Sequence, residues 1–180
     1  MAWTAPMTAV DNTAFTAAQF NTHVRDNLLE TMPGKATTVG SYFVSSDANN
    51  IVERFSYHDE IATEESTSSS AFTDLATVGP SITFDPGPSF LVFLSVEIRH
   101  NSSTTANSHM GMEVSGGISG SPSTGVVAGG VSGPSNPRQL GSVFRIVNVT
   151  EGVPTTITAK YRSSSGVANF SNRRIGVINF

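Results

Sequence analysis

The chain has 180 residues, which is enough for one domain with an appendage, and only 13% of them are charged. A net charge of −4 and only two lysines, Lys35 and Lys160, provide no basic surface, so we expect no nucleic-acid partner. The absence of cysteine excludes disulfides, thiolate metal sites and cysteine nucleophiles.

We expect no signal peptide in the first residues. They lack a basic start, and proline and threonine interrupt the apolar residues of "AWTAPMTAV". The longest apolar run, "FLVFL" at 90–94, is far shorter than the roughly 18 residues of a membrane-spanning helix. We therefore expect synthesis in the cytoplasm without an export signal, and no insertion into a membrane.

One amphipathic helix is expected at residues 16–30, "TAAQFNTHVRDNLLE". Thr16 and Gln19 have the spacing of a capping box. Phe15 and Phe20 occupy the two positions of a hydrophobic staple. Pro33 predicts that the helix ends near Met32.

An apolar stripe runs along this helix, formed by Phe20, Val24 and Leu28. A helix of about fifteen residues is marginally stable alone, so the stripe must be buried against its own domain or against other copies or a larger assembly. We favour the second interpretation because Trp3, the only tryptophan, lies with Pro6 in a non-periodic arm and is suited to anchoring in a partner's pocket. A tryptophan folded back over its own helix remains the alternative.

From residue 39 the hydrophobic pattern has a period of two. Short strands are expected at "VGSYFV" and "NIVERF", with a turn at 47–50. Alternation in three later segments predicts the inward-facing side chains. These are Val92, Leu94, Val96, Ile98, Met110, Met112, Val114, Ile157, Ala159 and Tyr161. The segment "GSVFRIVNVT" is apolar on both faces and is expected to be a central strand.

The last segment, "ANFSNRRIGVINF", changes phase. Phe170, Ile178 and Phe180 share one parity, whereas Ile175 and Val177 have the other. Either a bulge near residues 172–174 causes the switch, or the strand is buried on both faces. An apolar C-terminal strand also suits burial between subunits, so Ile175, Val177 and Phe180 are candidate interface residues.

Regular short strands with Gly/Pro-rich connections indicate an all-β fold, a jelly-roll-like β-sandwich over 39–180. An up-and-down barrel is the main alternative. Residues 1–38 form the extended arm and helix, with an attachment or oligomerisation role. The candidate interface of this segment comprises Trp3, Pro6, Phe15, Phe20, Val24 and Leu28.

No catalytic, cofactor-binding or metal-binding residue can be assigned. "HDE" at 58–60 is interpreted as a solvated turn, because neighbouring strand residues point to alternate sides. Glu97 and Glu113 are possible cross-strand neighbours, but outward charges on a sandwich usually serve solubility. No G-x-S-x-G elbow or phosphate-binding loop is present. We expect no enzymatic activity and no cofactor.

The N-terminal segment resembles one found in structural proteins of tailed bacteriophages, particularly phages of actinobacteria, with the form W-T-x-P…T-A-x-x-x-N-T-H-V-R-D-N-L. The matching positions cover about the first thirty residues of the chain. They are Trp3, Thr4, Pro6, Thr16, Ala17, Asn21, Thr22, His23, Val24, Arg25, Asp26, Asn27 and Leu28.

The resemblance implies a virion component, either a minor tail or tail-tip protein or a capsid decoration protein, commonly a homotrimer that contacts other virion proteins. The chain lacks the repeats or coiled-coil shaft of many receptor-binding fibres. A module that binds carbohydrate or a host receptor, including a host surface glycan, is the alternative from another class. A hydrolase acting on the cell envelope is a third hypothesis.

Overall fold

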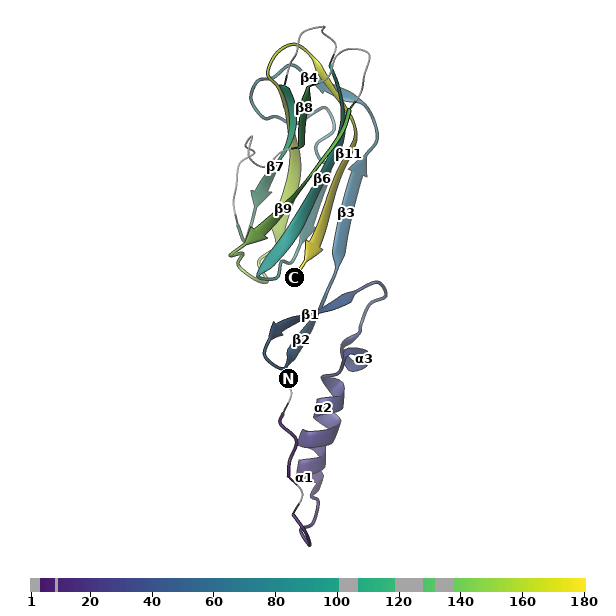
Figure 1. Cartoon of the computed structure of the whole chain (residues 1–180), viewed down its shortest axis with the longest axis vertical. Coiled ribbons are helices and arrows are strands. Elements are labelled where there is room, and N and C mark those ends of the chain that lie inside the picture. The colour runs from purple at the N-terminus through teal and green to yellow at the C-terminus, as the bar shows by residue number, and fades with distance from the viewer. Residues whose placement is uncertain (1–3, 9, 101–106, 119–127, 132–137) are drawn as a thin grey trace. The chain divides into compact units, whose positions relative to one another are not determined.

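The computed structural model describes residues 4–8, 10–100, 107–118, 128–131 and 138–180 (Figure 1). The chain forms two compact units, Met1–Phe55 and Ser56–Phe180. The sequence placed the boundary after residue 38. In the structure the boundary lies after Phe55, because the hairpin of β1 (Tyr42–Asp47) and β2 (Asn50–Arg54) belongs to the first unit.

The helix of the first unit begins as predicted. Thr16 accepts a hydrogen bond from the Gln19 backbone, and the Gln19 side chain accepts one from the Thr16 backbone, so the capping box is complete. The rings of Phe15 and Phe20 meet edge to face with centroids 6.1 Å apart, which confirms the staple. The helical residues divide into four segments, α1 (Ala17–Phe20), the π-helical η1 (Asn21–Arg25), α2 (Asp26–Leu29) and α3 (Met32–Lys35).

The helix therefore breaks after Leu29, slightly earlier than expected, and Pro33 lies inside the short turn α3. Proline is tolerated in a first helical turn, where its missing N–H leaves no backbone acceptor unpaired. The spacing of apolar residues in the sequence does not indicate the π-helical segment.

The second unit is a jelly-roll-like β-sandwich of two antiparallel sheets, as predicted (Figure 1). One sheet has the order β5-β10-β7-β8, and the other has the order β3-β11-β6-β9, with β4 also pairing with β11. The strands are β3 (Ser56–Ile61), β4 (Glu65–Thr67), β5 (Ser81–Phe84), β6 (Ser89–His100), β7 (Asn107–Ser115), β8 (Ala128–Val131), β9 (Arg138–Val147), β10 (Thr155–Ser163) and β11 (Ala168–Asn179).

The core lies between the two sheets and contains the side chains that alternation predicted to face inward. Every residue of the predicted inward set on β6, β7 and β10 is buried. Phe90 joins them, and its ring meets that of Phe84 edge to face at 5.0 Å. This burial is the main source of the sandwich's stability.

The phase change in β11 is a bulge, one of the two predicted explanations. The pairing register of β11 with β6 shifts between Ser171 and Arg174, and Asn172 has a φ of 48°. Phe170 before the bulge and Ile175 after it therefore both point into the core. The extra residue also turns Arg173 inward, where its side chain is fully buried.

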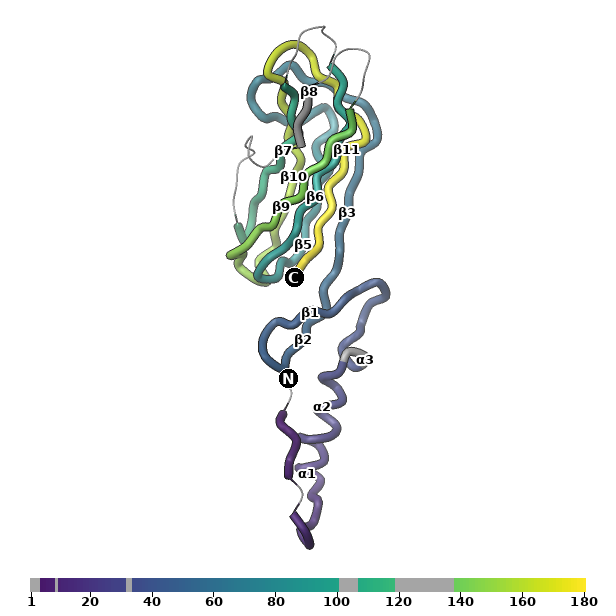
Figure 2. Tube along the Cα trace, in the orientation of Figure 1, coloured from purple at the N-terminus to yellow at the C-terminus, as the bar shows by residue number. Residues whose placement is uncertain are grey.

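Two strand predictions were wrong. The segment "GSVFRIVNVT" contributes to β9, which ends its sheet instead of lying in the middle (Figure 2). Val143 and Val147 on this strand are 56% and 47% exposed. The segment "HDE" lies in β3, paired with β11, and is not a turn. In both cases the pairing partner, distant in sequence, decided the outcome.

Candidate functional site

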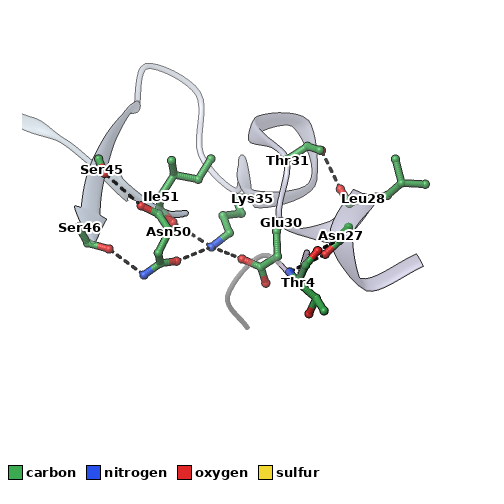
Figure 3. A network of polar contacts seen from close by, with 10 residues as sticks. All are labelled: Thr4, Asn27, Leu28, Glu30, Thr31, Lys35, Ser45, Ser46, Asn50 and Ile51. Carbon is green, nitrogen blue, oxygen red and sulfur yellow. Dashed lines mark hydrogen bonds and ion pairs between the residues drawn. The ribbon is translucent and has the colours of Figure 1, made fainter. Parts of the chain in front are cut away.

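The arm of the first unit is hydrogen-bonded to the helix through one buried side chain. Asn27 is 4% exposed, and its Oδ1 accepts from the Thr4 backbone N–H at 2.9 Å. Its Nδ2 donates to the Thr4 carbonyl at 2.8 Å (Figure 3). The same Nδ2 also donates to the His23 carbonyl at 3.1 Å. His23 Nδ1 lies 3.1 Å from the Ala5 carbonyl oxygen. The amide of Asn27 thus occupies both backbone groups of one arm residue, as a neighbouring strand would.

Sequence reasoning missed this role of Asn27. The residue was noted only as a position matching the phage segment, because a polar residue off the apolar stripe has no periodic signal. A polar side chain that must be buried to hold an arm becomes recognisable only when the arm is placed against the helix.

The apolar stripe of the helix faces outward. Phe20 is 47% exposed and Leu28 is 62% exposed, while Val24 is half-buried. Phe15 is 55% exposed and Pro6 is exposed as well. Trp3 lies outside the described residues. Within the described part of the first unit, the arm thus covers the polar Asn27 side of the helix and leaves Phe20 and Leu28 uncovered.

A pocket opens beside the start of the helix. Its volume is about 360 Å³, and its lining includes the apolar side chains of Met7, Val10 and Phe15. Val10 is 68% exposed at its edge. None of the described lining residues is acidic or basic, so the pocket offers no converging charged groups for chemistry.

The C-terminal end of the helix is fixed to the β1–β2 hairpin by Lys35. Its Nζ lies 2.6 Å from Glu30 Oε2 and donates to the Ile51 carbonyl at 2.8 Å and to Asn50 Oδ1 at 3.3 Å (Figure 3). The hydrogen bond from Lys35 lowers the pKa of Glu30. A lysine in the last turn also complements the helix dipole. Helix and hairpin are thereby joined within the first unit.

Glu53 on β2 holds the segment before the hairpin. Its carboxylate accepts from Ser41 Oγ at 2.6 Å, from the backbone N–H groups of Thr37 and Thr38 at 3.0 Å, and from the Thr37 hydroxyl. The hydrogen bonds from the side chains of Ser41 and Thr37 lower the pKa of Glu53 from its ordinary 4.5 to about 2.

The lowered pKa of Glu53 predicts how the stability of this segment depends on pH. Because the pKa is lower in the folded state, the stabilisation by Glu53 is complete above about pH 4.5 and is lost as the pH falls towards 2. The amide resonances of Thr37 and Thr38, followed by NMR, are expected to titrate with a midpoint near pH 2. In Glu53→Gln this transition should be missing. A midpoint near 4.5 in the original chain would contradict the hydrogen-bond assignment.

The three predicted interface residues of β11 separate into two groups. Ile175 and Val177 are each 1% exposed and contribute to the core, so their predicted interface role is corrected to a packing role. Their parity is opposite to that of Ile178 because strand side chains alternate between faces. Phe180 is half-buried, and its backbone N–H donates to the Ser89 carbonyl at 2.9 Å.

The acidic residues considered for chemistry have other roles. Glu97 lies on β6 and Glu113 on β7, which belong to different sheets, so they are not cross-strand neighbours. Glu113 Oε2 lies 3.1 Å from Lys160, and Glu97 accepts from Asn172 at 2.9 Å. Among the residues that the structure describes, no cluster of three His, Cys, Asp or Glu side chains could hold a metal.

The tyrosines do not form an exposed platform for sugars. Tyr161 is fully buried, and its hydroxyl donates to the Gly79 carbonyl at 2.9 Å. Tyr57 is half-buried with its ring 5.3 Å from that of Phe84, and Tyr42 is half-buried with its hydroxyl bonded to the Phe55 carbonyl. In the described ranges, no helix is long and apolar enough to cross a membrane.

The second unit thus belongs to the class of jelly-roll-like β-sandwich modules, here preceded by an arm-and-helix unit. The chain matches no protein-family model and no curated protein.

Solved structures similar to it include that of the infectious bursal disease virus Gx strain, at 11% identity and a TM-score of 0.49, over 76% of this chain and 37% of that chain. The CBM22-1–GH10 modules of Clostridium thermocellum xylanase 10B, complexed with xylohexaose, have 13% identity and a TM-score of 0.35. This match covers 80% of this chain and 25% of that chain. A family 35 carbohydrate-binding module from Clostridium thermocellum has 18% identity and a TM-score of 0.30, over 78% of this chain and 98% of that chain. The chain therefore spans well under half of the first two. Similarity at this level carries no functional argument.

Proposed function

We propose that this protein is a non-enzymatic structural component of a bacteriophage virion. It attaches through its N-terminal unit and displays the β-sandwich. The observation that carries the proposal is the outward-facing apolar stripe on a helix whose other side is already occupied by its own arm. Phe20 and Leu28 are large apolar side chains that the described part of their own unit does not cover. Exposed apolar surface of this kind marks a site of protein–protein contact.

The resemblance of the first thirty residues to phage structural proteins supports the same assignment from an independent direction. The motif positions include Asn27 and His23, whose side chains contact the arm, and Leu28, which is exposed. The segment therefore combines residues that shape the attachment unit with residues that meet a partner. The proposed partners are other virion proteins and two further copies of the chain in a homotrimer.

The virion assignment is tested on phage particles. Antibodies raised against the purified chain, applied to gradient-purified particles of the phage encoding it, are expected to label one site, the head surface or the tail tip. Mass spectrometry of the same particles should detect the chain in a fixed ratio to the major capsid protein. Its absence from purified particles would overturn the proposal.

The homotrimer is tested with a charge placed in the stripe. Leu28→Lys is expected to lower the solution mass threefold in light scattering, because a lysine cannot be buried without a partner at an apolar interface. Thr22→Lys, on an exposed position of the same helix, is the matched control and should retain the mass. An unchanged mass in Leu28→Lys would show that the stripe does not hold copies of the chain together.

A further inference from the structure

The two units differ in how they bury their apolar side chains. Every buried apolar residue that the structure describes lies in the second unit. In the first unit, Asn27 is the only described residue that is buried, whereas Phe15, Phe20, Leu28 and Leu29 are exposed. Burial of apolar surface is the main favourable term in folding. The first unit therefore has little of the term that stabilises the sandwich.

Each part of the first unit is of a kind that is marginal by itself. The helical residues before the break extend from Ala17 to Leu29, a length at which an isolated helix is marginal in water. Strands β1 and β2 form a sheet of only two strands, and an isolated hairpin of this kind is marginal as well. The apolar side chains of this hairpin are half-buried at Phe43, Val44, Ile51 and Val52.

The contacts described above that join these parts are polar. Asn27 holds the arm on the helix, Lys35 joins the helix to the hairpin, and Glu53 holds the segment before β1. Each of these hydrogen bonds replaces bonds to water, so its net contribution to stability is small. The polar contacts thus specify how the parts are arranged, but they supply little of the stability that a buried core would give.

Small units without a core are normally stabilised by disulfides, by a metal or by association with another protein. The chain contains no cysteine, which excludes disulfides. Across the part of the chain that the structure describes, no group of side chains could hold a metal ion. Association is the device that is left, and the exposed side chains of Phe20 and Leu28 suit it.

We propose that the first unit is only marginally stable in a single copy and gains most of its stability when its apolar stripe is buried in the assembly. Folding of the attachment unit is then coupled to assembly, whereas the sandwich is equally stable in both states. The inference rests on the proposed function, which supplies the partner that covers the stripe.

Hydrogen exchange of the full chain, followed by mass spectrometry, tests this coupling in Leu28→Lys. Leu28 is 62% exposed in a single copy, and lysine forms helices about as well as leucine, so the unit's own stability should change little. A lysine in the stripe opposes its burial in the assembly. The amides of residues 17–29 are therefore expected to exchange about a hundredfold faster than in the original chain, as loss of a well-populated partner predicts.

Two controls accompany this measurement. The amides of β6 and β10 should exchange equally in both chains, because the core of the sandwich lies outside the first unit. Thr22→Lys places the same charge at another exposed position of the helix and should exchange like the original chain. The mass of each chain is measured by light scattering at the same concentration.

The mass separates this inference from the proposed function. If Leu28→Lys has a lower mass but unchanged exchange at residues 17–29, the unit is stable alone, and the inference is overturned while the homotrimer stands. Faster exchange with an unchanged mass would mean that the stripe is covered within one chain, which also overturns the inference. An original chain that is monomeric and already exchanges as fast as Leu28→Lys would support the inference and remove the homotrimer from the proposed function.

Discussion

Replacing Arg173 with methionine is expected to lower the free energy of unfolding of the sandwich by about 3 kcal/mol, because it removes one partner of a buried ion pair. The guanidinium has no exposed surface. Its Nη1 lies 3.2 Å from Glu65 Oε2, and it stands 5.5 Å from the centre of the Tyr161 ring. Nη2 also donates to the Thr63 carbonyl at 3.3 Å. Methionine fills much of the volume but leaves the carboxylate and the carbonyl without this donor.

The neighbouring Arg174 is the control for this prediction. It lies on the outer face, with its side chain 48% exposed and its Nε 2.9 Å from Glu60. Arg174→Met is therefore expected to cost less than about 1 kcal/mol, as exposed ion pairs do. Urea unfolding followed by circular dichroism gives both values. Equal losses for the two variants would contradict the assignment of Arg173 as the arginine that the bulge turns inward.

Replacing Asn27 with alanine is expected to release the arm from the helix at a cost of about 2 kcal/mol, from two hydrogen bonds to the Thr4 backbone. The amide of Thr4 should then exchange with solvent about thirtyfold faster, since local opening free energy sets protection. The helix itself should persist, because its capping box at Thr16 is separate from the arm.

Two measurements separate arm release from general unfolding. Hydrogen exchange should change at Thr4 and Ala5 and remain unchanged in β2. Thr22→Ala, on an exposed position of the same helix, should leave arm protection intact, because the hydrogen bonds from the helix to the described arm residues come from Asn27 and His23. If the Thr4 amide kept its protection in Asn27→Ala, the arm would be held by other contacts, and the described role of Asn27 would be wrong.

Arm release also bears on attachment. The arm is hydrogen-bonded to one side of the helix while Phe20 and Leu28 remain exposed. In the proposed attachment to the virion, the partner therefore meets a surface that is already organised. Pre-organisation reduces the entropy lost on binding. Incorporation of Asn27→Ala into particles is therefore expected to be weaker than that of the original chain, even though no contacting apolar side chain is changed.

The sequence by itself determined the features that depend on local or periodic patterns. Alternation fixed the inward faces of β6, β7 and β10 because side chains of a strand point to opposite sides. The capping box at Thr16 involves residues three apart. The phase change before Ile175 indicated either a bulge or a strand buried on both faces, and the register of β11 with β6 decided for the bulge. Each of these is visible within a short window of the chain.

Only the tertiary structure decided what depends on distant partners. The apolar pattern of a strand predicts a central position in the sheet as long as its neighbours are unknown. Strand β9 is instead an edge strand, and Val143 on it is exposed. Glu97 and Glu113 were separated by their assignment to different sheets, and Ile175 was assigned to the core by the sheet that faces β11. Asn27 acquired its role from an arm 23 residues away. Hydrogen-bond partners and burial at such separations are set by the packing of whole elements, which no local pattern encodes.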